Sequence, residues 1–172
     1  MAHGMGCQAN RVRMASTRGG KRKHKIVSAL TVILAAGNAT ASEKDDAVAP
    51  VRQFIDGFNK GDVANALAAC ASPVFIVDEF PPYAWQGATA CADWAGDFEA
   101  NAKKDAITDS VVTLQKPRRV DVSGDRAYVV IPSNYDYKQK GKKVSQKGST
   151  LTAALQKGPA GWRITAWTWS TR

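Results

Sequence analysis

The chain after residue 47 begins with apolar residues at the spacing of an α-helix. They recur every three or four positions from Val48 to Phe58, and the run ends at Asn59-Lys60-Gly61. Asp62 is a good N-cap for a second, shorter helix, because its carboxylate can accept hydrogen bonds from the first turn, and Pro73 terminates that helix. Two helices are therefore expected before any strand.

A short strand and a third helix follow. Residues 74–77 are β-branched or aromatic and predict a strand, which ends at two acids and the rigid turn Phe80-Pro81-Pro82. From Thr89, a candidate N-cap, to about Asp105, one helical face is apolar and the opposite face is charged. The helical half of the chain therefore ends near Asp105.

The second half of the chain consists of long extended runs separated by turn residues. The runs cover about 108–122, 125–138, 143–157 and 161–171. A strand of about 13 residues would span about 43 Å, whereas a compact body of this size is about 36 Å across, so the strands must curve. Pro117, Pro132 and Gly148 mark the bends. The pattern predicts an α+β fold with three N-terminal helices in the concave face of a strongly bent, mixed but mainly antiparallel sheet.

The last strand carries apolar bulk on both of its faces. Alternation places Thr165, Trp167 and Trp169 on one face and, on the other, Trp162, Ile164, Ala166, Thr168 and Ser170. One face can pack on the helices, and exposing two indoles on the other would cost about 25 cal/mol per Å². We therefore expect a homodimer through the outer sheet face. The alternative is a β-bulge that shifts the register and places one Trp inside.

The net charge of +9 comes mostly from the front of the chain. Residues 1–41 hold seven Lys or Arg and no acid, which leaves only +2 for the rest. An uncharged run from Ile26 to Ala36 precedes a small-residue cleavage site after Ala41, which is typical of a secretory signal peptide. A retained membrane anchor is the weaker alternative, because the apolar centre is too short. We expect a periplasmic or secreted protein, with a flexible segment at 42–47 and no stable membrane insertion after cleavage.

The expected mature chain, residues 42–172, contains no His and no Met. Ser-His-Asp triads, Cys-His pairs, His-ligated zinc sites and His general bases are therefore excluded there. The glycine loops that cradle phosphates are also missing. We expect no cofactor and no metal site. The lysines around Gln139-Lys140-Gly141 predict a solvated hairpin tip and not a nucleic-acid site, because export separates the protein from nucleic acid.

Two cysteines lie in the predicted helical half. Cys70 ends the second helix and Cys91 opens the apolar face of the third. An exported protein permits a disulfide between them, which would close a loop of about 22 residues and contribute about 3 kcal/mol. The alternative is two separately buried thiols.

The order of elements and several local motifs point to one superfamily. The motifs are Phe54 to Asp62, Ile76 to Pro82, Trp85-Gln86-Gly87 and Gly161-Trp162-Arg163-Ile164. With these features the chain resembles the nuclear transport factor 2-like (NTF2-like) superfamily, the cystatin-like cone fold of ketosteroid isomerase, scytalone dehydratase and SnoaL-type polyketide cyclases, and especially its exported bacterial members. The resemblance covers 48–172 as one domain. It implies the fold more closely than an activity, because this fold hosts several enzyme classes and non-catalytic assembly domains.

The resemblance also implies a catalytic carboxylate. In ketosteroid isomerase-like members an acid at the end of the first strand takes a proton next to a carbonyl, and Asp78 or Glu79 falls there. Only one can face inward, where desolvation would raise its pKa as a general base requires. The alternative is that both acids solvate the strand end. Phe54 replaces the family's Tyr donor and Thr150 or Leu151 its second acid, which argues against steroid isomerisation.

Other side chains are candidates to line a cavity. Tyr83 and Trp85 could form its mouth, and Phe54 and Trp94 could lie on the helical wall. Polar contacts could come from Asn134, Tyr135, Asp136, Thr168 and Ser170. Each of these can also be explained as ordinary surface or core. The sequence thus predicts an exported protein that binds a small apolar molecule in a hydrophobic cavity. A cofactor-independent isomerase or dehydratase and a non-catalytic dimerisation module are the alternatives.

Overall fold

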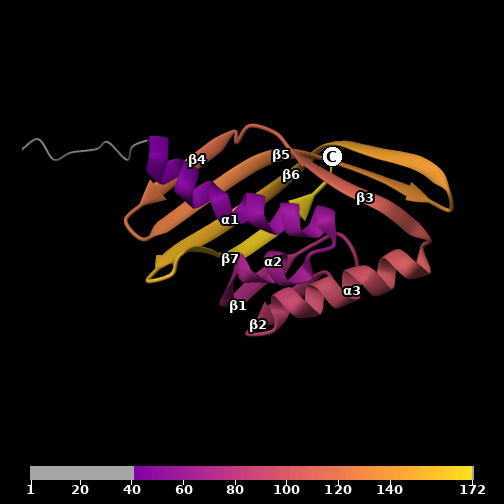
Figure 1. The fold of residues 1–172 in the computed structure, drawn as a ribbon, viewed down its shortest axis with the longest axis horizontal. Helices are drawn as coiled ribbons and strands as arrows, with labels where there is room; N and C mark the ends of the chain where they lie inside the picture. The colour runs from indigo at the N-terminus through magenta and orange to yellow at the C-terminus, as the bar shows by residue number, and fades with distance from the viewer. Residues whose placement is uncertain (1–40, 172) are drawn as a thin grey trace, which may run out of the picture. The chain divides into compact units, whose positions relative to one another are not determined.

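The computed structural model describes residues 41–171, which form three helices and a seven-stranded sheet (Figure 1). Two helices come before the first strand in the chain, and the third lies between the second and third strands. The elements are α1 Ala41–Lys60, α2 Val63–Ala68, β1 Cys70–Val77, β2 Ala84–Gly87, α3 Ala90–Lys104, β3 Ile107–Leu114, β4 Arg119–Ser123, β5 Arg126–Gln139, β6 Lys142–Gly158 and β7 Gly161–Ser170. The predicted signal peptide lies outside the described residues, apart from Ala41, and stays a prediction.

The strands form one open sheet in the order β2-β1-β7-β6-β5-β3, with β4 pairing to β5 beside β3. β1 and β7 are parallel, and every other pair in this sheet is antiparallel. The three helices lie along one face of the sheet (Figure 1). The predicted α+β fold with a mixed, mainly antiparallel sheet is confirmed.

The predicted strand at 108–122 is divided into β3 and β4 around Pro117. Both pieces pair with β5, β4 with its first half and β3 with its second. Pro132 lies in β5 where the partner changes, so its missing N–H falls in the gap between the two ladders. The proline thus marks a change of pairing partner, as a bend in the sheet requires.

Helix α1 begins earlier than the sequence predicted. Residues 42–47, expected to be flexible, are helical, and Ala47 is completely buried. Lys44, Asp45 and Asp46 are exposed, while Ala47 extends the buried stripe of Val48 and Val51 by one turn. Glu43 also approaches Lys157, in the last part of β6, at 3.7 Å.

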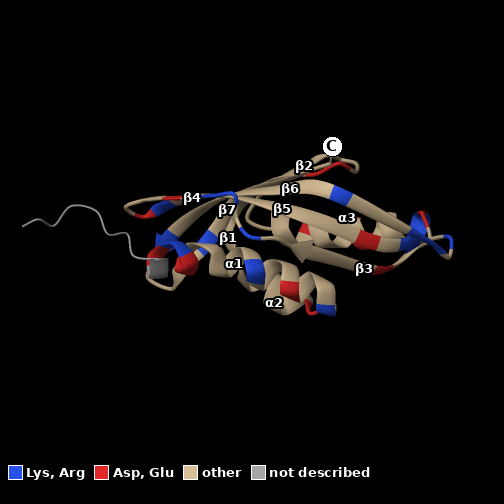
Figure 2. Cartoon of the chain, turned by 90° about the horizontal axis from the view of Figure 1, so that it is seen from above, with Lys and Arg blue, Asp and Glu red and all other residues tan. Residues whose placement is uncertain are grey.

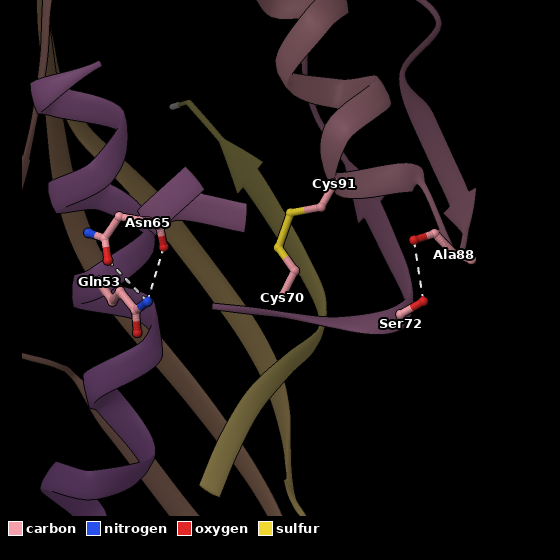
Figure 3. Close-up of a disulfide and its surroundings, with 6 residues drawn as sticks. All are labelled: Gln53, Asn65, Cys70, Ser72, Ala88 and Cys91. Carbon is pink, nitrogen blue, oxygen red and sulfur yellow. Dashed lines mark hydrogen bonds between the residues drawn. A yellow bond between two sulfur atoms is a disulfide. The ribbon is translucent and has the colours of Figure 1, made fainter. Parts of the chain in front are cut away.

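Helices α1 and α2 pack closely at a glycine. A Cβ built on Gly57 would lie only 2.6 Å from the backbone nitrogen of Ala66, so no larger residue fits there without a shift. The Gln53 side chain donates to the Asn65 carbonyl oxygen at 3.0 Å across the same contact (Figure 3). Asp62 caps α2 as predicted, since its Oδ1 accepts from the Asn65 N–H at 3.1 Å.

Cys70 and Cys91 form a disulfide (Figure 3), as predicted, and the alternative of two free thiols is wrong. The bond joins the first residue of β1 to the first turn of α3. These two elements therefore have a covalent tie at the end opposite to Asp78, which directly follows β1. Since the reduced chain lacks this constraint, the disulfide stabilises the fold chiefly through the unfolded state.

A β-bulge at Thr165 changes the faces of β7. Ala166 pairs with Ala154 while Ile164 pairs with Leu155, so Thr165 has no register partner on β6. Its hydroxyl donates to the Ala154 carbonyl at 3.1 Å. Ile164 and Trp167, three positions apart, thereby face the same side of the sheet as Leu155 and Ala153, their partners on β6, and Trp167 is only 5% exposed.

The bulge corrects the predicted faces of the last strand. Trp167 and Trp169 do not form an outer patch but lie on the inner face with Trp162 and Ile164. The alternative prediction, a bulge that turns a Trp inward, is confirmed, and both indoles follow it. The argument for a homodimer through exposed indoles is therefore lost, and the dimer itself stays a prediction.

Candidate functional site

A pocket of about 260 Å³ lies between α1, α3 and the inner face of the sheet. Its lining consists of Phe54, Ile55, Phe58, Asp78, Glu79, Phe80, Trp94, Phe98, Asn101, Ile107, Val112, Tyr135, Tyr137, Gln146, Leu151, Trp167 and Trp169. Nine of these 17 side chains are aromatic, two are acidic and none is basic. The pocket thus combines apolar walls with a small number of polar groups, as small-molecule sites usually do.

The aromatic wall is held together by ring contacts around Trp94. Its indole lies 5.0 Å from Trp167 in an edge-to-face arrangement and 5.4 Å from Phe54, measured between ring centroids. Phe98, one turn further along α3, stacks on it at 5.6 Å. Such packed rings favour fixed geometries and contribute beyond their buried area. The wall is therefore formed before any ligand arrives.

Asp78 is a carboxylate that the fold partly buries in this wall. It directly follows β1, and its Oδ2 accepts a hydrogen bond from Trp94 Nε1 at 2.9 Å. Its Oδ1 accepts from the backbone N–H of Glu79 at 2.7 Å. The side chain thus has two donors and no basic partner among the ion pairs of residues 41–171.

The environment of Asp78 raises its pKa. Burial is the main cause, since it disfavours the charged carboxylate, and the negative charge of Glu79 adds to the effect. The hydrogen bonds from Trp94 and from the Glu79 N–H lower the pKa but only in part offset burial. The carboxyl therefore binds its proton more tightly than an ordinary Asp, as a general base near neutral pH requires.

Glu79 lines the same pocket but remains exposed. Its carboxylate accepts hydrogen bonds from both the backbone N–H and the hydroxyl of Thr171, just after β7. These contacts tie the turn after β1 to the end of the chain. Of the two predicted acids, Asp78 is the more buried, and Glu79 is exposed and forms the contact with Thr171.

Tyr135 supplies a second polar group from the sheet. Its hydroxyl lies 2.9 Å from that of Ser110 on β3, within hydrogen-bonding distance. Burial raises the phenol pKa, the Ser110 contact opposes this, and the charges of Tyr137 and Asp78 raise it further. The phenol therefore stays protonated at neutral pH and can donate a hydrogen bond.

Tyr83 and Trp85, which were predicted to form the mouth of the cavity, do not line the pocket. Trp85 is buried on β2, outside the pocket lining, where its Nε1 donates to Asp97 at 2.8 Å and its ring lies 5.1 Å from Phe80. Tyr83 is 57% exposed with a φ of 72°, in the turn before β2. Both belong to the connection between β1 and α3, which the sequence did not place relative to the sheet.

Of the five predicted polar residues of the sheet, Tyr135 lines the pocket and the other four do not. On β5, Tyr135 and Tyr137 face it, so the alternating neighbours Asn134 and Asp136 point to the other side. Asn134 accepts from the Gly148 N–H at 3.2 Å, and Asp136 pairs with Lys147 at 3.2 Å. The same alternation on β7 turns Thr168 and Ser170 away from the pocket. The candidates on β5 thus included both faces of the strand, and those on β7 lie on the face that points away from the pocket.

The sequence identified part of the aromatic wall. Phe54 and Trp94 line the pocket as expected, whereas Trp167 and Trp169 were missed because the bulge was not predicted. The other aromatic residues not predicted for the site are Phe58, Phe80, Phe98 and Tyr137. Phe58 and Phe98 already belonged to the predicted apolar helix faces, and that signal could have found them.

No group of three or more His, Cys, Asp or Glu side chains within residues 41–171 is arranged to hold a metal ion. None of the helices described is both long enough and apolar enough to cross a membrane.

Residues 48–171 match the sequence model of the SnoaL-like domain. No curated protein matches the chain significantly. Among solved structures, an NTF2-like protein with a cystatin-like fold from Novosphingobium aromaticivorans is 17% identical, with a TM-score of 0.61, covering 76% of this chain and 82% of its own.

Two further structures resemble the chain at a similar level. A proposed ketosteroid isomerase from Shewanella frigidimarina is 24% identical, with a TM-score of 0.58 and coverage of 73% and 94%. A proposed dehydratase of the NTF2-like family from Streptomyces avermitilis is 19% identical, with a TM-score of 0.62 and coverage of 76% and 96%. At these identities the likeness shows the fold, which is the NTF2-like cone.

Proposed function

The chain belongs to the SnoaL-like domain family, and we propose that it binds a small, largely apolar molecule in the aromatic pocket, with Asp78 as the polar anchor. The observation that carries this proposal is a partly buried carboxylate, hydrogen-bonded to Trp94, in a pocket with nine aromatic side chains. Burying such a group without a counter-charge costs free energy, and a structural role would not require the pocket beside it.

The size of the pocket limits the ligand. Small-molecule sites usually measure about 300 to 1,000 Å³, and 260 Å³ lies just below this range. A ligand that fits has one to three rings, and its apolar surface would contact Phe54, Trp94 and Trp169. This composition supports a naphthalene-based aromatic compound as the first probe.

Binding can be measured with N-phenyl-1-naphthylamine, a neutral fluorophore whose emission rises in apolar surroundings. We expect saturable binding by the wild-type chain and a loss of about tenfold or more in affinity for Gln146→Trp, which fills the pocket. Gln156→Trp is the matched control, because it makes the same change on the same strand outside the pocket lining. Equal binding by both variants would place the probe elsewhere and contradict the proposal.

A second candidate function is cofactor-independent proton transfer, such as isomerisation or dehydration, with Asp78 as general base. It is supported by the raised pKa of Asp78 and by the protonated phenol of Tyr135, which supplies a donor that the sequence seemed to lack at Phe54. The base would take a proton next to a carbonyl, and the phenol would donate a hydrogen bond to the developing oxyanion.

The enzymatic candidate can be tested with 2-tetralone, a two-ring ketone. The protein is incubated with it in deuterated water, and exchange at the carbon next to the carbonyl is followed by NMR. Asp78→Asn should remove the exchange above the buffer rate, whereas Asp136→Asn, outside the pocket, should retain it. If the wild-type chain exchanges the proton no faster than buffer alone, the enzymatic candidate is wrong and the binding proposal is unaffected.

We also propose that the protein acts in the periplasm or outside the cell after cleavage behind Ala41. The disulfide between Cys70 and Cys91 supports this, because such bonds form and persist in oxidising compartments. Expression of the full chain in a bacterial host, followed by mass measurement of the periplasmic fraction, should give a product that begins at Ser42. Full-length product retained in the cytoplasm would contradict the proposal.

A further inference from the structure

We propose that the ligand of this pocket carries a positive charge on its apolar frame, as quaternary ammonium compounds and protonated tertiary amines do. This inference rests on the proposed binding function and names the chemical class of the ligand. Three features carry it: the charges of the lining, the isolation of Asp78 from basic side chains and the kind of aromatic ring exposed to the pocket.

The lining has only negative formal charge. Asp78 and Glu79 are its two ionisable acids, and no Lys or Arg belongs to it. The described ion pairs all lie elsewhere, and those nearest along the sheet hold Lys138 to Asp109 and Lys147 to Asp136. Most basic residues lie toward the two ends of the sheet (Figure 2). An anionic ligand would therefore meet repulsion without a compensating base.

Asp78 has hydrogen-bond donors but no counter-charge. Trp94 Nε1 and the Glu79 N–H occupy one oxygen each, at 2.9 and 2.7 Å. A neutral apolar ligand would displace water from this carboxylate without offering it a hydrogen bond or an opposite charge. A cation in the pocket would restore the electrostatic energy that desolvation removes, and the low local dielectric strengthens that attraction.

The aromatic lining favours the same charge. Cations are attracted to the faces of aromatic rings, most strongly to Trp, and cages of such rings bind quaternary ammonium groups. Trp94, Trp167 and Trp169 line the pocket together with the stacked pair Tyr135 and Tyr137, whose ring centroids are 4.7 Å apart. A carboxylate among rings of this kind selects an apolar cation over a neutral molecule of equal shape.

Two probes of equal shape test the charge alone. Phenyltrimethylammonium is a permanent cation, and tert-butylbenzene has the same form without charge. Displacement of N-phenyl-1-naphthylamine should show that the cation binds at least about tenfold more tightly than the neutral compound. Asp78→Asn should reduce this preference to less than about threefold, whereas Asp136→Asn, which removes an exposed carboxylate outside the pocket, should leave it unchanged.

The pH dependence gives a second readout, because neither probe titrates. Affinity for the cation should fall as the pH is lowered and Asp78 gains its proton, while affinity for tert-butylbenzene should not fall. The other titratable groups of the lining are Glu79, Tyr135 and Tyr137. The phenol of Tyr135 stays protonated in this range, and Glu79→Gln should keep the fall with pH if Asp78 causes it.

The outcomes separate this inference from the proposed function. If N-phenyl-1-naphthylamine itself does not bind, both are wrong. If the fluorophore binds but the two probes displace it equally, the pocket binds apolar molecules and the charge selectivity is wrong. If the preference for the cation persists in Asp78→Asn, the assignment of that selectivity to Asp78 is overturned.

Discussion

The two ends of the helix-covered face differ in how they fill the space under α1. At one end the first half of α1 packs over β4 and the adjoining halves of β5 and β6, through aliphatic residues such as Val51, Val129, Ile131 and Leu155, all almost completely buried (Figure 1). At the other end the second half of α1 meets aromatic rings, and a pocket of about 260 Å³ remains.

The difference shows how one sheet can serve both stability and binding. Branched aliphatic side chains interdigitate to the density of an organic solid, so little space is left between them. Large flat rings contact one another at edges and faces, and they leave a volume that their neighbours cannot enter. We therefore expect substitutions at the aliphatic end to lower stability, and substitutions at the aromatic end to lower binding.

The largest expected effect on stability is at the aliphatic end. Ile131→Ala removes a fully buried side chain and should lower the free energy of unfolding by about 2 to 5 kcal/mol, measured by denaturant titration. Affinity of the folded variant for N-phenyl-1-naphthylamine should stay within about twofold of wild type. A loss below about 1 kcal/mol would mean that this end is not closely packed.

Loss of the disulfide has the next largest expected effect on stability. Replacing Cys70 and Cys91 by Ser should lower the free energy of unfolding by about 3 kcal/mol, because the unfolded chain regains the freedom of a loop of 21 residues. Adding reductant to the wild-type protein during the denaturant titration provides the control and should give a similar loss. Unchanged unfolding midpoints in both experiments would contradict the bond.

A pair of Trp substitutions on β7 compares the two ends directly. Trp169→Leu, in the pocket and only partly buried, should cost less than about 1.5 kcal/mol of stability but lower affinity for N-phenyl-1-naphthylamine about tenfold. Trp162 is buried outside the pocket, so Trp162→Leu should lower stability by more than Trp169→Leu does and leave affinity for the fluorophore nearly unchanged. The comparison fails if both variants lose stability and binding to the same degree.

The smallest effect concerns pH and stability. The folded state raises the pKa of Asp78, so it binds this proton more tightly than the unfolded state, and stability from this group is lost as pH rises through the raised pKa. Asp78→Asn removes that dependence. The difference in Tm, variant minus wild type, should become more positive between about pH 3 and pH 7, and a constant difference would contradict the raised pKa.

Local sequence patterns predicted the elements well. The spacing of apolar residues and the cap at Asp62 predicted the helices, and the expectation of export together with two suitably placed cysteines predicted the disulfide between Cys70 and Cys91. These features depend on neighbours within a few turns of chain or on the compartment. The start of α1 was missed because the polar residues of 42–47 concealed the single buried position at Ala47.

The pocket was harder to predict because it depends on the register between strands. One unpaired residue, Thr165, reverses the faces of Trp167 and Trp169, and only the pairing with β6 reveals it. The same difficulty affected β5, where Tyr135 faces the pocket and Asp136 does not. Asp78 and Glu79 were both candidates, because the strand end before the rigid turn is visible in the sequence and the family resemblance places an acid there; only the fold distinguishes the two by their burial.

The central claim is that apolar walls shield Asp78 from water, and the pKa of this carboxyl tests it most directly. The side-chain carbonyl carbon of Asp78 can be labelled with ¹³C, assigned by its absence in Asp78→Asn, and followed by NMR through an acid titration. We predict a midpoint above the ordinary Asp value of 3.8, and a lower midpoint when phenyltrimethylammonium is bound. A midpoint at or below 3.8 in the free protein would contradict the account.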